Sequence, residues 1–331
     1  MLQWDDDLKI PSAGLYLDSR QPRPRCFVSH AHSDHIGCHL ETIATAPTAA
    51  FLARRTGAPC AGAADYDAPR ELEPRMTIRL LPAGHVLGSA MLHLTSPEGS
   101  LLYTGDFKLR PSLTAEAAQP RPADVLVMES TYGLPVFRFP PWREVADELL
   151  DRVESAFRAG RQPIVMGYSL GKAQEITRLL TDGGFNVTAH GAVASMSEIY
   201  RTFGVALGTW RRYRPEDFHG PAALDLRERG VLVAPPHVAR SAFVTRFKEP
   251  CRIMLSGWAL LKNAIYRYGV DHALPLSDHA DFGELLELAE QVRPRKIYTH
   301  HGYAEFVETL RARGHDAALA RPPAQLELFG E

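Results

Sequence analysis

The sequence predicts a layered α/β protein in which a strand-rich region is followed by a region of alternating strands and helices. Short apolar runs bounded by Gly, Pro, Asp or Ser dominate residues 1–130. From about residue 142, apolar positions at helical spacing alternate with short apolar strands. The first pattern is typical of sheets packed in layers, and the second is typical of strand–helix units around a partly parallel sheet.

The first region contains several segments with the length and boundaries of strands. They are 13–19, 25–30, 77–84, 90–96, 100–106 and 123–130. Residues 41–57 are Ala-rich, and we expect them to be helical around their middle. So many strands with so few long helices favour a sheet-rich layered domain over a doubly wound one.

The second region begins with a predicted amphipathic helix over 142–160, which ends at a glycine. Residues 162–180 and 186–204 each read as a strand, a turn and a helix, and two further apolar strands follow. These two strands are expected at 230–236 and 251–258, and the tail is expected to form a helix at 281–292, a strand at 296–302 and a helix at 304–314.

Composition excludes several classes of protein. The chain has 331 residues and a net charge of −2, so any contact with nucleic acid must come from local basic patches. It has no apolar run long enough to span a membrane and no signal-peptide pattern, so we expect a cytoplasmic protein. The four cysteines lack C-x-x-C spacing, which favours free thiols over disulfides or a thiolate metal site.

A cluster of histidines follows an apolar strand near the N-terminus, in FVSHAHSDH. His30 and His32 are two positions apart, so in an extended segment both side chains can face one ion. Asp34 and His35 come next and can face a second ion. Imidazole and carboxylate suit Zn²⁺, or Mn²⁺ with more oxygen ligands. The alternative is a polar loop that caps a helix beginning near Ile36.

Two later residues occupy similar positions at strand ends. His85 follows the strand expected at 77–84, and Asp106 ends the strand expected at 100–106. Each on its own is an ordinary loop or turn residue. Together with the first motif, His85 can complete a three-histidine site and Asp106 can bridge two metals.

The motifs H-x-H-x-D-H, G-H and T-G-D occur in this order along the chain. They resemble the metal-binding motifs of proteins with the metallo-β-lactamase fold. MESTYG (128–133), LSDHADFGELL (276–286) and IYTHHGY (297–303) look like motifs of its β-CASP branch, which processes nucleic acids. YSLGKAQEI and AHGAVASMSE are similar to the bacterial ligase-associated DNA exonuclease group.

The resemblance implies an αββα sandwich interrupted by an α/β module. The metallo-β-lactamase domain would comprise residues 1–136 and 273–331, and the β-CASP insertion would comprise residues 137–272.

The resemblance also implies a dinuclear centre with two divalent metals, zinc in the first place and manganese as the alternative. Metal one would be held by His30, His32 and His85, metal two by Asp34, His35 and His301, and Asp106 would bridge them. Asp34, Glu129 and His279 are the expected catalytic residues: Glu129 would orient a ligand or a catalytic histidine, and His279 would protonate the leaving oxygen.

The implied activity is hydrolysis of phosphodiester bonds in DNA, in the 5′ to 3′ direction on single strands, in DNA repair beside a DNA ligase. An RNA-processing nuclease is the alternative, because the eukaryotic cross-link-repair branch usually lacks the closing histidine that this chain has as His301. A small-molecule ester or lactone hydrolase and a non-catalytic nucleic-acid-binding relative are further alternatives.

Substrate contacts are expected from the inserted module. Ser169, Lys172 and His190 lie at strand-to-helix turns, where they can bind a phosphate or, for Ser169 and His190, simply cap a helix. The run TWRRYRPEDFH (209–219) interleaves aromatic and basic residues, and SRQPRPR (19–25) adds positive charge before the metal motif. Both suit single-stranded nucleic acid, although a solvated loop explains the first run equally well.

Overall fold

The computed structural model describes residues 2–4, 7–57, 62–215, 229–247 and 249–320. The chain forms two compact units, one made of Met1–Arg138 and His279–Glu331 and the other of Phe139–Asp278. The domain boundaries expected from the sequence, after residues 136 and 272, lie two and six positions from these. Nothing in the described residues is a helix long and apolar enough to cross a membrane.

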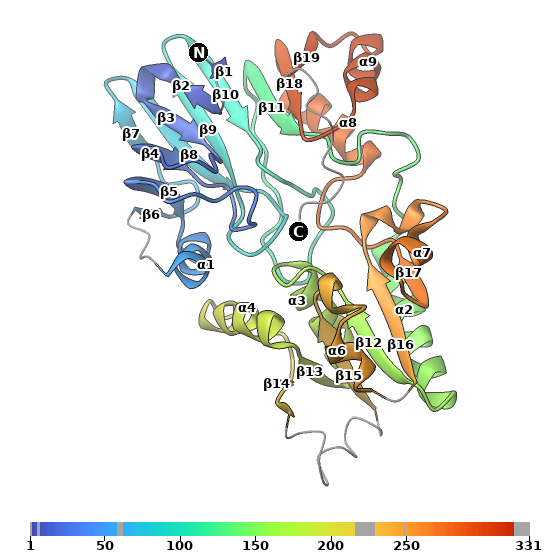
Figure 1. Ribbon diagram of the computed structural model, residues 1–331. Helices are drawn as coiled ribbons and strands as arrows, with labels where there is room; N and C mark the ends of the chain where they lie inside the picture. The colour runs from blue at the N-terminus through green and yellow to red at the C-terminus, as the bar shows by residue number, and fades with distance from the viewer. Residues whose placement is uncertain (1, 5–6, 58–61, 216–228, 248, 321–331) are drawn as a thin grey trace. The chain divides into compact units, whose positions relative to one another are not determined.

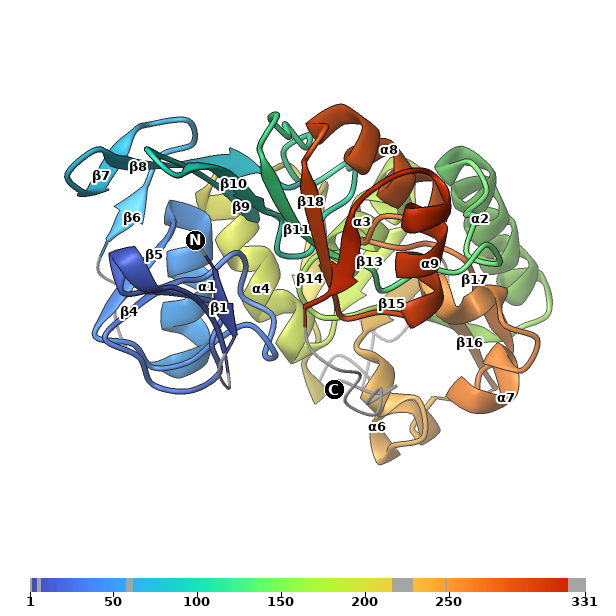
Figure 2. The same cartoon turned by 90° about the horizontal axis from the view of Figure 1, so that it is seen from above.

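The first unit is built around two sheets (Figures 1 and 2). The six-stranded sheet has the order β1 (Gln3–Trp4), β2 (Leu8–Ile10), β3 (Leu15–Leu17), β4 (Arg25–Phe27), β5 (Glu41–Thr45) and β6 (Ala63–Ala64). The seven-stranded sheet has the order β19 (Ala317–Leu319), β18 (Lys296–His300), β11 (Val125–Glu129), β10 (Gly99–Tyr103), β9 (Ala90–Ser96), β8 (Met76–Pro82) and β7 (Arg70–Glu73).

Burial on alternate positions explains how the layers stack. Side chains from both sheets, such as Ile10 and Phe27 from one and Leu92 and Leu101 from the other, share one buried cluster. The opposite face of the seven-stranded sheet packs through Met128 and its neighbours against α8 (Phe282–Val292) and α9 (Ala304–Ala312). Helix α1 (Ala46–Thr56) contacts β5 and β6 of the other sheet. The order of layers is therefore helix, sheet, sheet, helix, which confirms the predicted αββα sandwich.

The helix expected around the middle of residues 41–57 is α1, which begins at Ala46. The residues before it, 41–45, form strand β5, which was not predicted from the sequence. Thr42, Ile43 and Thr45 are β-branched, which favours an extended backbone. The helix starts where the Thr45 hydroxyl accepts a hydrogen bond from the Thr48 amide, at 3.3 Å.

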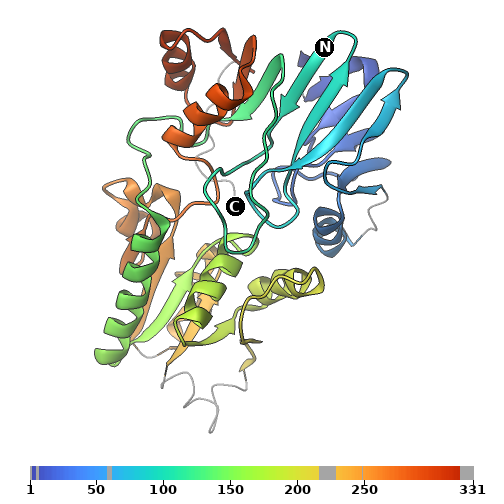
Figure 3. The same ribbon diagram turned by 180° about the vertical axis from the view of Figure 1, so that it is seen from behind.

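The second unit is a six-stranded sheet flanked by helices (Figure 3). Its strand order is β14 (Trp210–Arg212), β13 (Asn186–Ala189), β15 (Gly230–Ala234), β12 (Gln162–Met166), β16 (Pro250–Leu255) and β17 (His272–Leu274). Its helices include α2 (Trp142–Arg158), α3 (Lys172–Asp182), α4 (Gly191–Thr202), α6 (Ala242–Thr245) and α7 (Ala264–Tyr268).

The sheet of the second unit was expected to be partly parallel, but every described strand pair in it is parallel. Such strands need crossover connections, and α3 lies between β12 and β13 while α4 lies between β13 and β14. One face of the sheet packs through Ile164 and Leu232 against the segment that contains α6. Helices α2 and α3 contact strands β12, β13, β15 and β16.

Candidate metal centre

The cluster of titratable side chains lies within the first unit, where several strands end at one edge of the sandwich. His30 and His32 follow β4, His85 follows β8 and Asp106 follows β10. Strands β10, β11 and β18 run parallel, so Glu129 and His300, the last residues of β11 and β18, end at the same edge. The amide of Ala90 donates to the carbonyl of Ser29 at 2.9 Å and ties the loops of the two sheets together.

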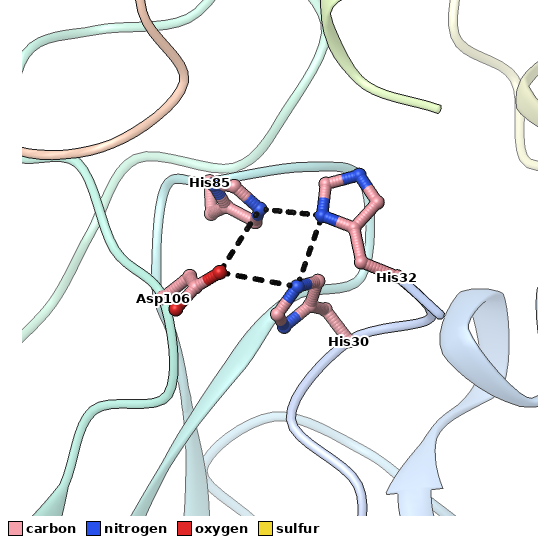
Figure 4. Close-up of side chains that lie close together, drawn as sticks. All are labelled: His30, His32, His85 and Asp106. Carbon is pink, nitrogen blue, oxygen red and sulfur yellow. Dashed lines mark hydrogen bonds and ion pairs between the residues drawn. The ribbon is translucent and has the colours of Figure 1, made fainter. Parts of the chain in front are cut away.

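Three imidazoles of the cluster point at one another (Figure 4). The Nε2 atoms of His30 and of His85 each lie 3.1 Å from Nδ1 of His32. His30 is fully buried and His85 is 2% exposed. Burial disfavours the charged form and lowers the pKa of His30 well below its ordinary value. His30 is therefore held in the neutral form that a metal ion requires.

The Asp106 carboxylate reaches the same point with a single oxygen. Its Oδ2 lies 3.4 Å from Nε2 of His30, 3.4 Å from Nε2 of His35 and 3.8 Å from Nε2 of His85. Burial opposes the ionised form of Asp106, but His35 and His279 outweigh it, so the Asp106 pKa lies well below its ordinary value. An ionised oxygen shared by imidazoles that face one another is the arrangement that a bridging ligand requires.

These residues fit a divalent cation. Four ligand atoms about 2 Å from a tetrahedral metal are roughly 3.3 Å apart, which is close to the nitrogen separations seen here. One ligand atom from each of His30, His32, His85 and Asp106 falls within 4.8 Å of every other. Lone pairs packed this closely repel one another unless a proton or a cation lies between them.

The residues predicted for the second metal lie around His35. Burial opposes protonation of His35, but the carboxylates of Asp106 and Asp34 outweigh it and raise the His35 pKa well above its ordinary value. The Asp34 Oδ2 lies 3.6 Å from Nε2 of His35, and the Asp34 side chain is 52% exposed. The His301 ring centroid lies 5.7 Å from that of His35. This group is looser than the one around His30, and its backbone includes a left-handed residue, His301, with φ of 53°.

Sequence reasoning missed Asp18, a buried carboxylate behind the centre. Its Oδ2 accepts hydrogen bonds from the Tyr103 hydroxyl at 2.7 Å and the Ser29 hydroxyl at 2.6 Å, and it lies 3.0 Å from Nδ1 of His35. A proton held on Nδ1 of His35 leaves Nε2 free to bind a metal. The available signal was an aspartate directly after an apolar strand, in LYLDS.

Glu129 and His279 form a second group around the Asp106 carboxylate. Nδ1 of His279 lies 3.0 Å from both carboxylate oxygens of Glu129 and 3.8 Å from Oδ2 of Asp106. Glu129 is fully buried, and it also accepts hydrogen bonds from the Phe107 amide at 2.8 Å and the Thr131 hydroxyl at 2.6 Å. Glu129 therefore fixes the orientation of the His279 ring.

Arg110 fixes the backbone that carries His279. Its guanidinium donates to the carbonyl of His279 at 3.1 Å and pairs with the carboxylate of Glu284. Glu284 in turn accepts a hydrogen bond from the amide of Asp281 at 2.9 Å and completes a capping box at the start of α8. No local motif indicates this contact, because Arg110 and Glu284 are 174 positions apart.

Two of the three predicted phosphate-binding residues, Lys172 and His190, contact other residues of the second unit. Lys172 is 3% exposed, and its Nζ lies 3.1 Å from the carboxylate of Asp278. His190 caps α4 through Nδ1, which accepts a hydrogen bond from Ala192 at 3.2 Å. The alternative of a cap by Ser169 is wrong, because Gly171 is the N-cap of α3 and Gln174 accepts its amide hydrogen at 2.8 Å.

The two basic runs are also largely paired within the fold. Arg23 and Arg25 form ion pairs with Asp7 and Glu41. Arg212 pairs with Glu198 at 2.9 Å. Residues 216–219 of the second run lie outside the described residues.

Comparisons with known proteins find relatives of this chain. Residues 267–319 match RMMBL, described as a Zn-dependent metallo-hydrolase RNA specificity domain. The chain is 38% identical over 334 residues to a "Probable DNA ligase" of Opitutus terrae, a match that covers 99% of this chain and 32% of that protein. It is 28% identical over 179 residues to an "RNase J-like protein" of Methanocaldococcus jannaschii, covering 47% of this chain and 42% of that protein.

The chain belongs to the metallo-β-lactamase/β-CASP family. It spans about a third of the length of the Opitutus terrae protein and less than half of the length of the RNase J-like protein. A crystal structure of a protein of unknown function from Enterococcus faecalis V583 has the same fold, with a TM-score of 0.61 and 14% identity, covering 91% of this chain and 80% of that one.

We predict that the metal affinity of the centre depends on Asp18, because its carboxylate contacts Nδ1 of His35. In Asp18→Asn, an amide replaces the carboxylate that holds Nδ1 of His35, and we expect zinc affinity to fall about 10- to 100-fold. Competition titration with a zinc indicator measures this change. Asp67→Asn, which removes an exposed carboxylate of the same unit, should leave affinity unchanged. Equal affinity in wild type and Asp18→Asn would show that Asp18 does not support a ligand.

Proposed function

We propose that this protein is a metal-dependent nuclease that hydrolyses phosphodiester bonds of single-stranded DNA from the 5′ end, in DNA repair. The observation that carries the proposal is the Asp106 oxygen, which lies between a cluster of imidazoles and the Glu129–His279 pair. DNA as the substrate is supported by the printed name of the Opitutus terrae relative, a probable DNA ligase. The direction of cleavage and a functional link to a ligase are inferred from the resemblance of the motifs.

The donor set favours zinc as the resident cation, because imidazole nitrogens outnumber carboxylate oxygens. His30, His32 and His85 would hold one cation, and His35 with Asp34 and His301 would hold the other. Asp106 would be shared between them. When bound, divalent cations in such a site polarise a phosphate oxygen and lower the pKa of water.

The protein's own contribution to the chemistry is proton transfer and positioning. Glu129 contacts Nδ1 of His279, which leaves Nε2 free to give a proton to the leaving oxygen. The leaving alkoxide is strongly basic, so its departure near neutral pH requires this proton. Arg110 and Glu129 hold the backbone and the ring of His279 independently, which keeps the acid at a fixed place beside Asp106.

An RNA-processing nuclease is the second candidate. The matched family is described as an RNA specificity domain, and the relative from Methanocaldococcus jannaschii is named RNase J-like. The metal centre does not distinguish DNA from RNA, because it would contact the phosphodiester that both polymers share. Cleavage assays with DNA and RNA substrates are therefore needed to distinguish the two candidates.

The test compares single-stranded DNA and RNA of one sequence, each with a 5′-phosphate or a 5′-hydroxyl and a label at either end. Zinc-loaded and manganese-loaded protein should release mononucleotides from DNA progressively from the 5′ end. Cleavage confined to RNA, or internal cuts, would favour the second candidate. No cleavage of either polymer would refute the nuclease proposal.

His279→Ala should keep both metals but lose about 10²- to 10⁴-fold in kcat, the usual contribution of general acid catalysis. With a p-nitrophenyl phosphodiester the loss should be much smaller, because that leaving group departs without a proton. Metal analysis and kinetics on the two substrates measure the difference. His93→Ala, a histidine of the same unit that contacts the Pro122 carbonyl, is the control. Equal losses on both substrates would rule out the acid role.

Arg110→Lys should lower kcat by about 10-fold to 100-fold while KM and metal content stay near wild type. Lysine keeps the positive charge beside buried Glu284 but cannot contact both Glu284 and the His279 carbonyl. Thermal unfolding of the variant checks that the fold is intact. Arg121→Lys, in the exposed pair with Asp67, is the matched control and should have wild-type kinetics. A wild-type kcat for Arg110→Lys would show that turnover does not require the hydrogen bond from Arg110 to the His279 carbonyl.

A further inference from the structure

Helix α7 of the second unit exposes a large aromatic side chain. Tyr266 is 82% exposed, and its neighbour Ile265 is 44% exposed. The helix has only five residues, but its backbone is well anchored. The Arg240 guanidinium donates to the Tyr266 carbonyl at 3.2 Å, the Gly269 amide donates to the Ile265 carbonyl at 2.9 Å, and the Tyr268 hydroxyl lies 3.0 Å from the Ser256 hydroxyl. The Tyr266 ring is thus presented to solvent from a fixed backbone.

The stretch of sequence that contains Tyr266 is basic. Residues 230–270 contain six lysines and arginines and one acidic residue, although the whole chain has a net charge of −2. Arg240 and Lys262 are exposed, and neither has a carboxylate partner among the residues that the structure describes. We call Arg240, Lys262, Ile265 and Tyr266 the Tyr266 surface.

An exposed ring whose backbone is hydrogen-bonded to an exposed arginine has the chemistry of a site for single-stranded nucleic acid. Any base can stack on an aromatic ring, and stacking needs no particular sequence. Cations beside the ring attract the phosphates that link successive bases. Because Arg240 is hydrogen-bonded to the backbone of Tyr266, a cation and the ring lie close enough to contact adjacent parts of one strand.

The aromatic and basic run at 209–214 differs from the Tyr266 surface, because several of its side chains contact other parts of the fold. Arg211 donates to the Thr188 hydroxyl at 3.2 Å, and Arg212 pairs with Glu198. The Tyr213 ring packs edge-on against Phe243, with centroids 4.9 Å apart. Its side chains are largely used by the fold, whereas those of the Tyr266 surface remain available.

We propose that the Tyr266 surface binds the single-stranded nucleic acid substrate, with a base stacked on Tyr266 and phosphates at Arg240 and Lys262. This inference rests on the proposed nuclease function and extends it by naming a second contact for the strand. It concerns binding, so it can be tested without turnover.

Binding is measured by fluorescence anisotropy of labelled single-stranded DNA and RNA, with full-length protein in chelator so that no cleavage occurs. Tyr266→Ala should raise Kd about 5- to 100-fold, the range expected for loss of one stacked base. Tyr266→Phe should bind like wild type, because the ring is kept. Phe203→Ala, which removes another partly exposed aromatic ring of the same unit, is the control.

Two further measurements separate stacking from charge. A strand of abasic sites has phosphates but no bases, so Tyr266→Ala should not weaken its binding. Lys262→Gln should reduce the slope of log Kd against log salt by about one, as expected for loss of one phosphate contact.

The outcomes distinguish this inference from the proposed function. Equal Kd values for wild type and Tyr266→Ala on base-containing strands would refute the inference even if the wild type is an active nuclease, as would a wild type that binds neither polymer. Weaker binding by Tyr266→Ala would support the surface even if no cleavage is found. Turnover of a p-nitrophenyl phosphodiester should be the same in both proteins, because that ester has no base.

Discussion

One oxygen atom connects the titratable side chains of the candidate metal centre. Oδ2 of Asp106 lies within 3.8 Å of ring nitrogens from His30, His35, His85 and His279. A buried carboxylate among buried imidazoles is costly unless charge is balanced and every lone pair has a partner. The fold maintains this arrangement through the strand ends, the loops between them and the other buried carboxylates.

Two buried carboxylates support the centre from opposite sides. Asp18 lies behind His35 and receives hydrogen bonds from Ser29 and Tyr103, while Glu129 lies behind His279 and receives hydrogen bonds from Phe107 and Thr131. Each fixes Nδ1 of one histidine and leaves its Nε2 for other chemistry. In the proposed mechanism His35 would bind a cation and His279 would transfer a proton, so the same kind of carboxylate contact would serve both roles.

The sequence predicted the parts of the site that depend on local spacing. His30 and His32 could be paired because side chains two apart in an extended segment share a face, and His85 and Asp106 could be added because each follows an apolar strand. The same strands predicted a sheet-rich layered domain, whereas the αββα order of its layers was implied by the resemblance to the metallo-β-lactamase fold. Asp18 also follows an apolar strand, but its contact with Tyr103 could not be predicted from local spacing, because the two residues are 85 positions apart. Lys172 was expected to meet a phosphate, but it lies in a buried pair with Asp278, 106 positions away, which no local pattern indicates.

The position of His279 in the chain suggests why its segment is held so firmly. His279 is the first residue of the first unit after the chain leaves the second, and Asp278 is the last residue of the second unit. Arg110 holds the His279 carbonyl and Glu284 on one side of this crossing, and Lys172 holds Asp278 on the other. The Lys172–Asp278 pair and the contacts of Arg110 therefore anchor the chain on both sides of the peptide bond between Asp278 and His279.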